Sequence, residues 1–181
     1  MFERTNYVLI AARTRNQKPR AMPEELRERI KQTKPFESLG QKATVSLLVA
    51  ASAVKGKLNK IHSQHDIFGS QYNILRILAG GPPEGYPRCE IIERMINRGP
   101  DVTRLVDPLE ARGLIERARS EEDRRVVLHR ITEKGEDLLE KISPSLASVH
   151  DVLGEELSDN ELQEFSRLCA IIYQRFDETG C

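Results

Sequence analysis

The sequence contains no tryptophan, few other aromatic residues and no long apolar run, and these absences exclude several classes of protein. Aromatic residues make up 5% of the 181 residues. No apolar stretch approaches the roughly 20 residues that a membrane-spanning helix needs, so we expect no membrane partner. The apolar run at 7–12 is too short, and wrongly flanked, for a secretory signal. With 39% hydrophobic and 31% charged residues, the composition instead favours a soluble, helix-rich protein.

Cysteines and catalytic motifs are also scarce. The three cysteines, Cys89, Cys169 and Cys181, are far apart and form no CxxC pair. We therefore expect no disulfide framework and a cytoplasmic location. The sequence has no glycine-rich phosphate loop, no HExxH and no GxSxG motif. These gaps predict that the protein is not an enzyme and needs no metal or other cofactor.

The chain has no net charge, which at first argues against nucleic acid as a partner. Lys plus Arg and Asp plus Glu both number 28, but their distribution is uneven. Residues 1–87 carry 14 basic and 7 acidic side chains, residues 88–130 carry 10 and 9, and residues 131–181 carry 4 and 12. A neutral total with oppositely charged ends predicts segments with different roles.

The first 66 residues are predicted to form an arm and two helices. Residues 1–22 are polar and basic without lasting periodicity, so we expect a flexible arm, and Met22 is a second candidate for the native start. Residues 23–66 should contain a short helix to about residue 33 and a long helix from about 39 to 65. The long helix repeats apolar side chains at helical spacing: Leu47, Ala51, Val54, Leu58 and Ile61. Its wide apolar side predicts a contribution to a dimer interface.

Residues 67–132 combine short helices with a hairpin. Ser70 is predicted to cap one helix, Pro87 to begin the next, and a third runs from Pro100 to Gly113. Two short β-prone runs follow at 114–118 and 126–131, with a charged tip between them. Such helices followed by a two-stranded wing predict a winged helix-turn-helix that binds DNA.

The last segment, residues 133–181, is predicted to form two dimerisation helices. Thr132 should cap the first and Pro144 should kink or divide it. A capping box at 158–161 begins the second, whose apolar stripe is Leu162, Phe165, Leu168, Ile172 and Phe176. The predicted fold is therefore mainly α with a small β-wing, a winged helix-turn-helix flanked by N- and C-terminal dimerisation helices.

The winged helix-turn-helix predicted at 67–132 forms the central lobe of the chain. Two motifs in this lobe and the residues just after it resemble those of MarR-family transcription regulators. They are DVTRLVDPLEARGLIER at 101–117, which is similar to the family's recognition helix and first wing strand, and EDRRVVLHRITEKG at 122–135, which is similar to its wing. The run SQYNILRIL at 70–78 resembles the family's second helix. The resemblance spans about residues 39–176. It implies a homodimer that binds a palindromic double-stranded operator, as a repressor released by a small ligand.

The candidate DNA-binding residues follow from this alignment and from their chemistry. Near the recognition helix, Arg104 suits guanine and Thr103 suits a phosphate or a thymine methyl. In the wing, Asp123 and Arg125 match the family's acidic-x-Arg pair, which implies an arginine in the minor groove that the aspartate orients. The remaining candidates for base or phosphate contacts are Arg88, Asn97, Arg98, Asp101 and Arg124.

One position departs from the family pattern. Pro108 stands where family members commonly have arginine. Because a proline inside a helix removes one backbone hydrogen bond, we expect a kinked or tilted recognition helix. Proline also has no side-chain group that could bind a phosphate, so the resemblance carries no phosphate contact over to this position.

Alternatives stay open for the signal that releases the protein from DNA and for the macromolecule that it binds. The resemblance implies a cleft for a small aromatic or anionic effector, bordered by His62, His65, Tyr72 and Arg76. A metal shared by the first two of these, or oxidation of Cys89 beside Arg88, are alternative triggers. A winged-helix module that binds another protein instead of DNA is the remaining alternative.

Overall fold

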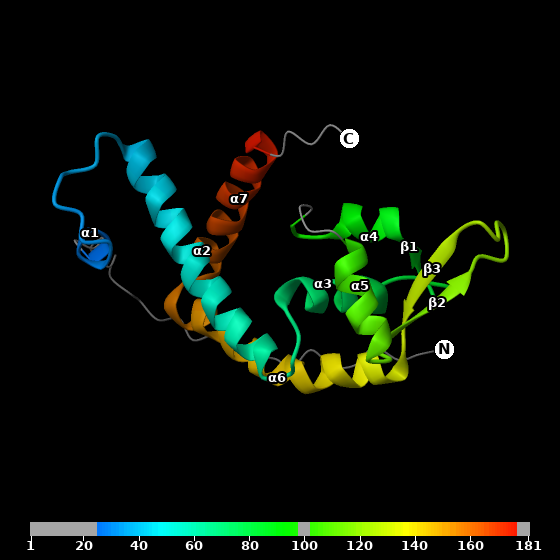
Figure 1. Ribbon diagram of the computed structural model, residues 1–181. Coiled ribbons are helices and arrows are strands. Elements are labelled where there is room, and N and C mark those ends of the chain that lie inside the picture. Colours follow the sequence, from blue (N-terminus) through cyan, green and yellow to red (C-terminus); the bar gives the residue numbers. More distant parts are fainter. Residues whose placement is uncertain (1–24, 98–101, 177–181) are drawn as a thin grey trace. The chain divides into compact units, whose positions relative to one another are not determined.

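The computed structural model describes residues 25–97 and 102–176 (Figure 1). The chain divides into two compact units, residues 1–47 and 48–181. Of the helix expected at 23–33, the described residues from 25 onward contain α1, Glu25–Arg29, and residues 23 and 24 lie outside the described part of the chain. Helix α1 ends where Lys31 takes a positive φ of 52°, a conformation that an α-helix cannot contain.

The long helix predicted at about 39–65 is confirmed as α2, Leu39–Ser63. Its end is a tight turn in which the backbone N–H groups of His65 and Ile67 both donate to the carbonyl of His62, at 3.0 and 3.3 Å. Asp66 sits in this turn with a φ of +55°, which reverses the chain toward the next helix. Ile61 and His62 are buried at this end.

Three helices form the core of the second unit. They are α3 (Gly69–Ala79), α4 (Arg88–Arg94) and α5 (Val102–Ala111). The cap predicted for α3 is wrong, because the helix begins one residue before Ser70 and Gln71 Oε1 accepts the backbone N–H of Phe68 at 3.0 Å. Buried apolar side chains from all three helices meet in one cluster, whose fully buried members include Ile74, Leu75, Ile91, Val106 and Leu109.

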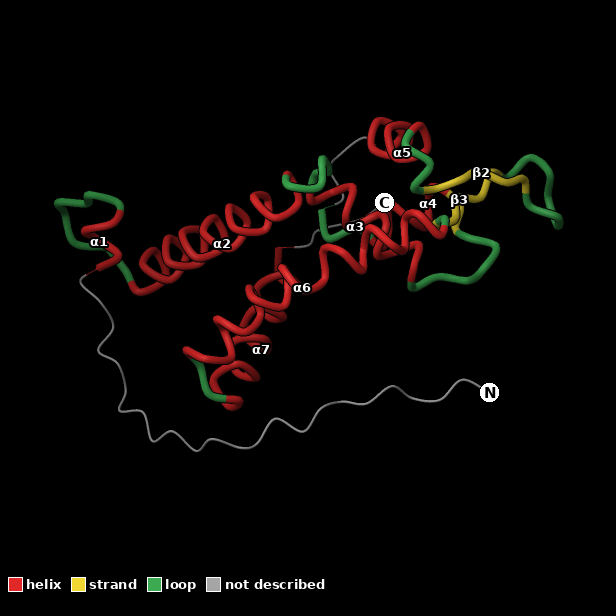
Figure 2. Tube along the Cα trace, turned by 90° about the horizontal axis from the view of Figure 1, so that it is seen from below, coloured by secondary structure: helices red, strands yellow, loops and turns green. Residues whose placement is uncertain are grey.

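The predicted hairpin is confirmed, and a third strand joins it. Strands β2 (Ile115–Arg119) and β3 (Val127–Ile131) pair antiparallel, and β1 (Tyr86–Pro87) adds to the other edge of β3. The hairpin tip extends beyond the helices of its unit (Figure 2). Gly85, before β1, has a φ of +90°, and a Cβ there would collide with the carbonyl of His129. Glycine is therefore required where β1 meets β3.

Both prolines expected to disturb helices lie inside continuous ones. Helix α5, for which a recognition role is expected, includes Pro108, and Gly113, with a φ of +67°, follows its end as expected. Helix α6, Glu133–Glu156, includes Pro144 and is not divided by it. Ile142 and Leu146, on either side of that proline, are buried in a second apolar cluster. This packing holds α6 together across the missing backbone hydrogen bond.

The predicted caps of the last two helices are confirmed. Thr132 Oγ1 accepts the N–H of Gly135 at the start of α6. Ser158 and Glu161 form the capping box of α7, Asp159–Phe176. None of the residues of α7 is buried. Across the described ranges, no helix combines the length and the apolar character that crossing a membrane would require.

Candidate nucleic-acid interface

A hydrogen bond joins the first residue of α4 to the first turn of α5. Arg88 Nη1 donates to Thr103 Oγ1 at 2.7 Å, across 15 positions of the sequence. The two residues line a cavity of about 330 Å³ with residues of the wing. Its lining comprises Pro87, Arg88, Cys89, Thr103, Val106, Arg117, Arg125, Val126, Val127 and His129. Three guanidinium groups therefore border one hollow between α4, α5 and the hairpin.

The charges of these three arginines are balanced differently. Arg117, on β2, forms ion pairs with Asp107 and with Glu110, the latter at 2.9 Å. These contacts fasten the wing to α5. Among the described residues, Arg88 donates a hydrogen bond to a neutral hydroxyl, which does not offset its positive charge. A phosphate group would supply the opposite charge that this guanidinium favours.

His129 is a buried histidine of the cavity lining, and its pKa responds to the arginines beside it. The imidazole is buried on β3, with Nδ1 lacking a partner among the described residues. Burial lowers the pKa of His129, and the positive charges of Arg117 and Arg88 lower it further, against smaller opposite effects of two carboxylates. The imidazole is therefore kept neutral and adds no charge to the lining, in which Arg117 is paired with two carboxylates and Arg88 contacts a neutral hydroxyl.

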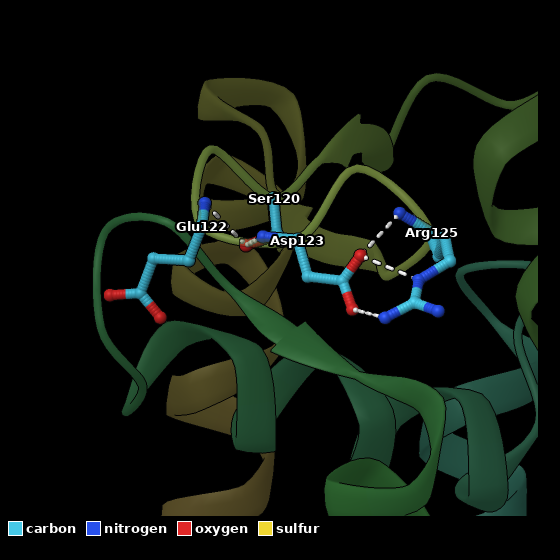
Figure 3. Close-up of polar contacts among 4 residues, drawn as sticks. All are labelled: Ser120, Glu122, Asp123 and Arg125. Carbon is cyan, nitrogen blue, oxygen red and sulfur yellow. Dashed lines mark hydrogen bonds and ion pairs between the residues drawn. The ribbon is translucent and has the colours of Figure 1, made fainter.

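The tip of the wing holds one arginine in a defined orientation (Figure 3). Asp123 accepts three hydrogen bonds from Arg125, one each from its backbone N–H, Nε and Nη2, all at 3.0 Å. Ser120 Oγ in turn accepts the N–H of Asp123 at 3.4 Å and that of Glu122 at 3.2 Å. The side-chain hydrogen bond from Arg125, and then the backbone one, lower the pKa of the Asp123 carboxyl. The guanidinium is therefore charged and held in one orientation, although the side chain of Arg125 is 91% exposed.

The other predicted DNA-binding residues divide into two groups. Arg104 on α5, Arg124 at the wing tip and Asn97 after α4 are exposed. Nearby, Asn73 Oδ1 accepts the N–H of Ile96 at 2.9 Å and so fixes the chain just before Asn97. Arg98 and Asp101 lie outside the described residues.

The predicted effector residues gather only in part. His62 and Tyr72 stack with ring centroids 4.7 Å apart and an interplanar angle of 28°. His62 is 4% exposed, and neither of its nitrogens has a partner among the described residues. Burial, and then the nearby His65, lower the pKa of His62. Arg76 is exposed one turn further along α3.

The two alternative triggers, a bound metal and the oxidation of a cysteine, depend on the positions of His, Cys, Asp and Glu side chains. Within residues 25–97 and 102–176, no group of three or more His, Cys, Asp or Glu side chains could hold a metal ion. Cys89 is exposed on α4 and Cys169 is half-buried on α7. Cys181 lies outside the described residues.

Sequence reasoning missed three residues of this lobe. Arg117 and His129 line the cavity, and Arg112 donates to the carbonyls of His65, at 3.2 Å, and of Asp66. Arg117 and His129 face each other across β2 and β3. That pairing could have been read from the hairpin register, because cross-strand partners share one face of the sheet. No local sequence pattern predicts the contacts of Arg112, because they join residues more than 40 positions apart.

Comparisons with known proteins agree with this architecture. The family model described as transcriptional regulator SarA/Rot matches residues 57–142. The chain is 31% identical to the HTH-type transcriptional regulator MgrA of Staphylococcus aureus over 123 residues, 67% of this chain and 80% of that protein. It is 36% identical to a MarR transcription factor from Planctomyces limnophilus of known structure, with a TM-score of 0.58 over 76% of this chain and 99% of that one.

A third similarity concerns the fold alone. CouR from Rhodococcus jostii RHA1, solved bound to p-coumaroyl-CoA, is 22% identical, with a TM-score of 0.65 over 81% of this chain and 99% of that one. The helix order, the wing and the relatives above 30% identity agree with one another. The chain belongs to the MarR-type winged-helix transcription regulators, which bind DNA and are not enzymes.

Proposed function

We propose that the protein is a cytoplasmic, homodimeric repressor that binds a palindromic operator and is released by a small aromatic or anionic effector. The observation that carries the proposal is the hollow between α4, α5 and the wing, where Arg88 and Thr103 are hydrogen-bonded and Arg125 lies on the same lining. Phosphate contacts fix a protein on the duplex and base contacts select the sequence. This surface offers side chains suited to both.

The proposed roles follow from position and chemistry. Arg104, exposed in the first half of α5, reads guanine in the major groove, and Thr103 contacts a phosphate or a thymine methyl. Arg125, oriented by Asp123, enters the minor groove. Phosphate contacts are proposed for Arg88, Asn97 and Arg124, and base or phosphate contacts for Arg98 and Asp101.

The homodimer is proposed from the surface of α7. Six large apolar side chains of this helix are exposed, between 39% and 81%: Phe165, Leu168, Ile171, Ile172, Tyr173 and Phe176. An exposed apolar face of this kind favours burial against a partner. A two-fold symmetric partner would place two recognition helices about 34 Å apart, matching half-sites one helical turn apart.

The effector site is proposed at the stacked pair His62 and Tyr72. His62 offers two buried nitrogens without partners among the described residues, and such groups gain free energy when a ligand supplies hydrogen bonds. His65 follows His62 by three residues, and Arg76 follows Tyr72 by four. CouR, a protein of the same fold, was solved with p-coumaroyl-CoA, whose acyl group is aromatic, and this supports a ligand with an aromatic group. Such a ligand acts by binding one arrangement of the lobe better than the other.

The experiment is binding of the full chain to its own upstream DNA, with a scrambled duplex of equal length as the control. We expect preference for the upstream fragment, a footprint of two half-sites about one turn apart, and affinity that falls steeply with salt. Equal affinity for the scrambled duplex would overturn sequence-specific binding. Absence of any salt-dependent DNA binding would favour the protein–protein module instead.

A reporter assay tests the repressor role and the response to an effector. A reporter driven by the upstream fragment should be less active when the protein is present, and phenolic carboxylates should restore its activity. Activation by the protein would contradict the repressor role. If the wild-type protein and a His62→Phe variant respond equally to the phenolic carboxylate, His62 is not part of the effector site.

A further inference from the structure

Arg112 connects two ends of helices that are far apart in the sequence. It follows Ala111, the last residue of α5, and its Nη2 donates to the carbonyl of His65 at 3.2 Å. Its Nη1 donates to the carbonyl of Asp66. Both acceptors belong to the turn between α2 and α3. A single guanidinium therefore ties the end of the recognition helix to the end of α2.

The turn it contacts needs donors from elsewhere. The last carbonyls of a helix have no partner within the helix and carry the negative end of its dipole. In this turn the backbone N–H groups of His65 and Ile67 both bond to the carbonyl of His62. The positive φ of Asp66 turns the chain away from α2, and the carbonyls of His65 and Asp66 are bonded by Arg112.

The backbone of the same segment is fastened on its other side. The carbonyl of Arg112 accepts a hydrogen bond from Lys134 Nζ at 2.7 Å, and the carbonyl of Gly113 accepts one from Thr132 Oγ1 at 2.7 Å. Lys134 and Thr132 belong to the start of α6 and its cap. Three elements, α2, α5 and α6, therefore meet at one residue.

The end of α5 has a particular need for such anchoring. Pro108 has no N–H, so the backbone bond that would join it to the carbonyl of Arg104 is absent from this ten-residue helix. The last turn of α5 is correspondingly less constrained by its own backbone. Arg112 supplies the missing constraint from outside the helix.

We propose that Arg112 is a positioning residue for DNA binding, which holds α5 at the angle at which it reaches the major groove. The proposal rests on the proposed function, because it takes α5 as the helix that reads DNA. Arg112 lies nine residues beyond Thr103, about 13 Å along the helix at 1.5 Å per residue. It therefore acts through α5 and not by a contact at the end of the helix that meets the bases.

The test compares operator affinity and its salt dependence in the full chain. Arg112→Ala should weaken operator binding about tenfold or more, since two charge-assisted hydrogen bonds are lost. The slope of log K against log salt should remain that of the wild type, because no phosphate contact is removed. Arg88→Ala, by contrast, should reduce that slope by about one. Arg167→Ala, which removes an exposed ion pair of α7, is the matched control and should change neither.

The conservative variant separates positioning from charge. Arg112→Lys keeps the charge but cannot present two donors in a fixed fork, so it should recover only part of the affinity. Wild-type affinity in either variant overturns the proposal, and so does a reduced salt slope, which would make Arg112 a phosphate contact. Should Arg112→Ala fail to fold by circular dichroism, the comparison is decided on Arg112→Lys alone.

The result also distinguishes this inference from the proposed function. If wild-type protein prefers its operator over scrambled DNA and both Arg112 variants match it, only the positioning role fails. If wild-type protein shows no such preference, the proposed function fails first. In that case unchanged melting temperatures of the Arg112 variants would also remove the anchoring role.

Discussion

Arg88 and Thr103 form a 2.7 Å hydrogen bond that joins the start of α4 to the first turn of α5. Both residues are candidates for DNA contact, and the bond means that neither acts alone. The hydroxyl sets the position of the guanidinium, whose charge then remains available for phosphate. DNA affinity should therefore depend on the neutral partner as well as on the charged one.

Thr103→Val tests this dependence, since it keeps the shape of the side chain and removes the hydroxyl. We expect operator affinity to fall about tenfold, from the loss of one hydrogen bond to a charged group. Fluorescence anisotropy with a labelled operator measures the change. Thr44→Val is the matched control, because Thr44 Oγ1 donates to a backbone carbonyl of α2, at 2.9 Å, outside the lobe. Equal affinity of the two variants would show that the Arg88–Thr103 bond has no role in binding.

Arg125→Ala should weaken operator binding strongly without unfolding the protein. The guanidinium is exposed and bonds to the carboxylate oxygens of Asp123, so its removal takes no contact from the apolar core. Gel-shift titration gives the affinity and circular dichroism the fold. Asp123→Asn should have a smaller effect in the same direction, because the arginine keeps its charge but loses its orientation. Unchanged affinity in Arg125→Ala would refute the wing assignment.

Gly135 sets how closely α6 approaches the hairpin. A Cβ at this position would collide with the carbonyl oxygen of Leu114 and with Ile131. Gly135→Ala should therefore destabilise the protein by about 2 kcal/mol or more in urea unfolding. Gly154 lies in the same helix, and a Cβ added there would meet nothing within 4 Å. Gly154→Ala should stabilise by about 0.5–1 kcal/mol, since alanine favours helix over glycine, and a similar result for both would contradict the close approach.

Stability should fall as the pH falls below about 6.5. Burial is the main cause that lowers the pKa of both His62 and His129 below the ordinary value of 6.5. Between each folded-state pKa and 6.5, the unfolded chain binds more protons than the folded one, so acid favours unfolding. The contribution is complete above pH 6.5 and is lost progressively as the pH falls through that window.

Urea unfolding at pH 7.5 and 5.5 measures this loss. His62→Phe keeps an aromatic ring against Tyr72 and cannot titrate, so its stability should change less between the two pH values. His150→Gln removes an exposed imidazole of α6 and should leave the wild-type difference unchanged. A wild-type stability that is the same at both pH values would contradict the prediction.

Local patterns predicted the elements of this fold well, and contacts between distant elements poorly. The pair Asp123 and Arg125 could be identified because two positions in one loop suffice to bring them together. Helix caps at Thr132 and Ser158 were equally local. Arg88 and Thr103 were each singled out, but their hydrogen bond depends on the angle between α4 and α5, which no periodicity contains.

Two other features show the same limit. Strand β1 has two residues, too few for an alternating pattern, and one of them is Pro87, which also precedes α4. The contact of Arg112 with the turn at Asp66 spans 46 positions and requires the packed lobe. Pro108 and Pro144 each lie inside a continuous helix, so a division at Pro144 is wrong, while a kink at either proline stays a prediction. Tertiary packing outweighed the local preference at Pro144.

The apolar face of α7 gives the last prediction. Leu168 is 44% exposed, among five other large apolar side chains of the same helix. If this face is buried between two copies, Leu168→Glu places a charge in the interface, where an unpaired charge is costly. The variant should sediment as a monomer near 20.6 kDa, where the wild type should show twice that mass. Operator affinity should fall with it, because a monomer engages one half-site only. Gln163→Glu adds the same charge to the opposite side of α7 and should remain dimeric, so dissociation of both variants, or of neither, would count against this interface.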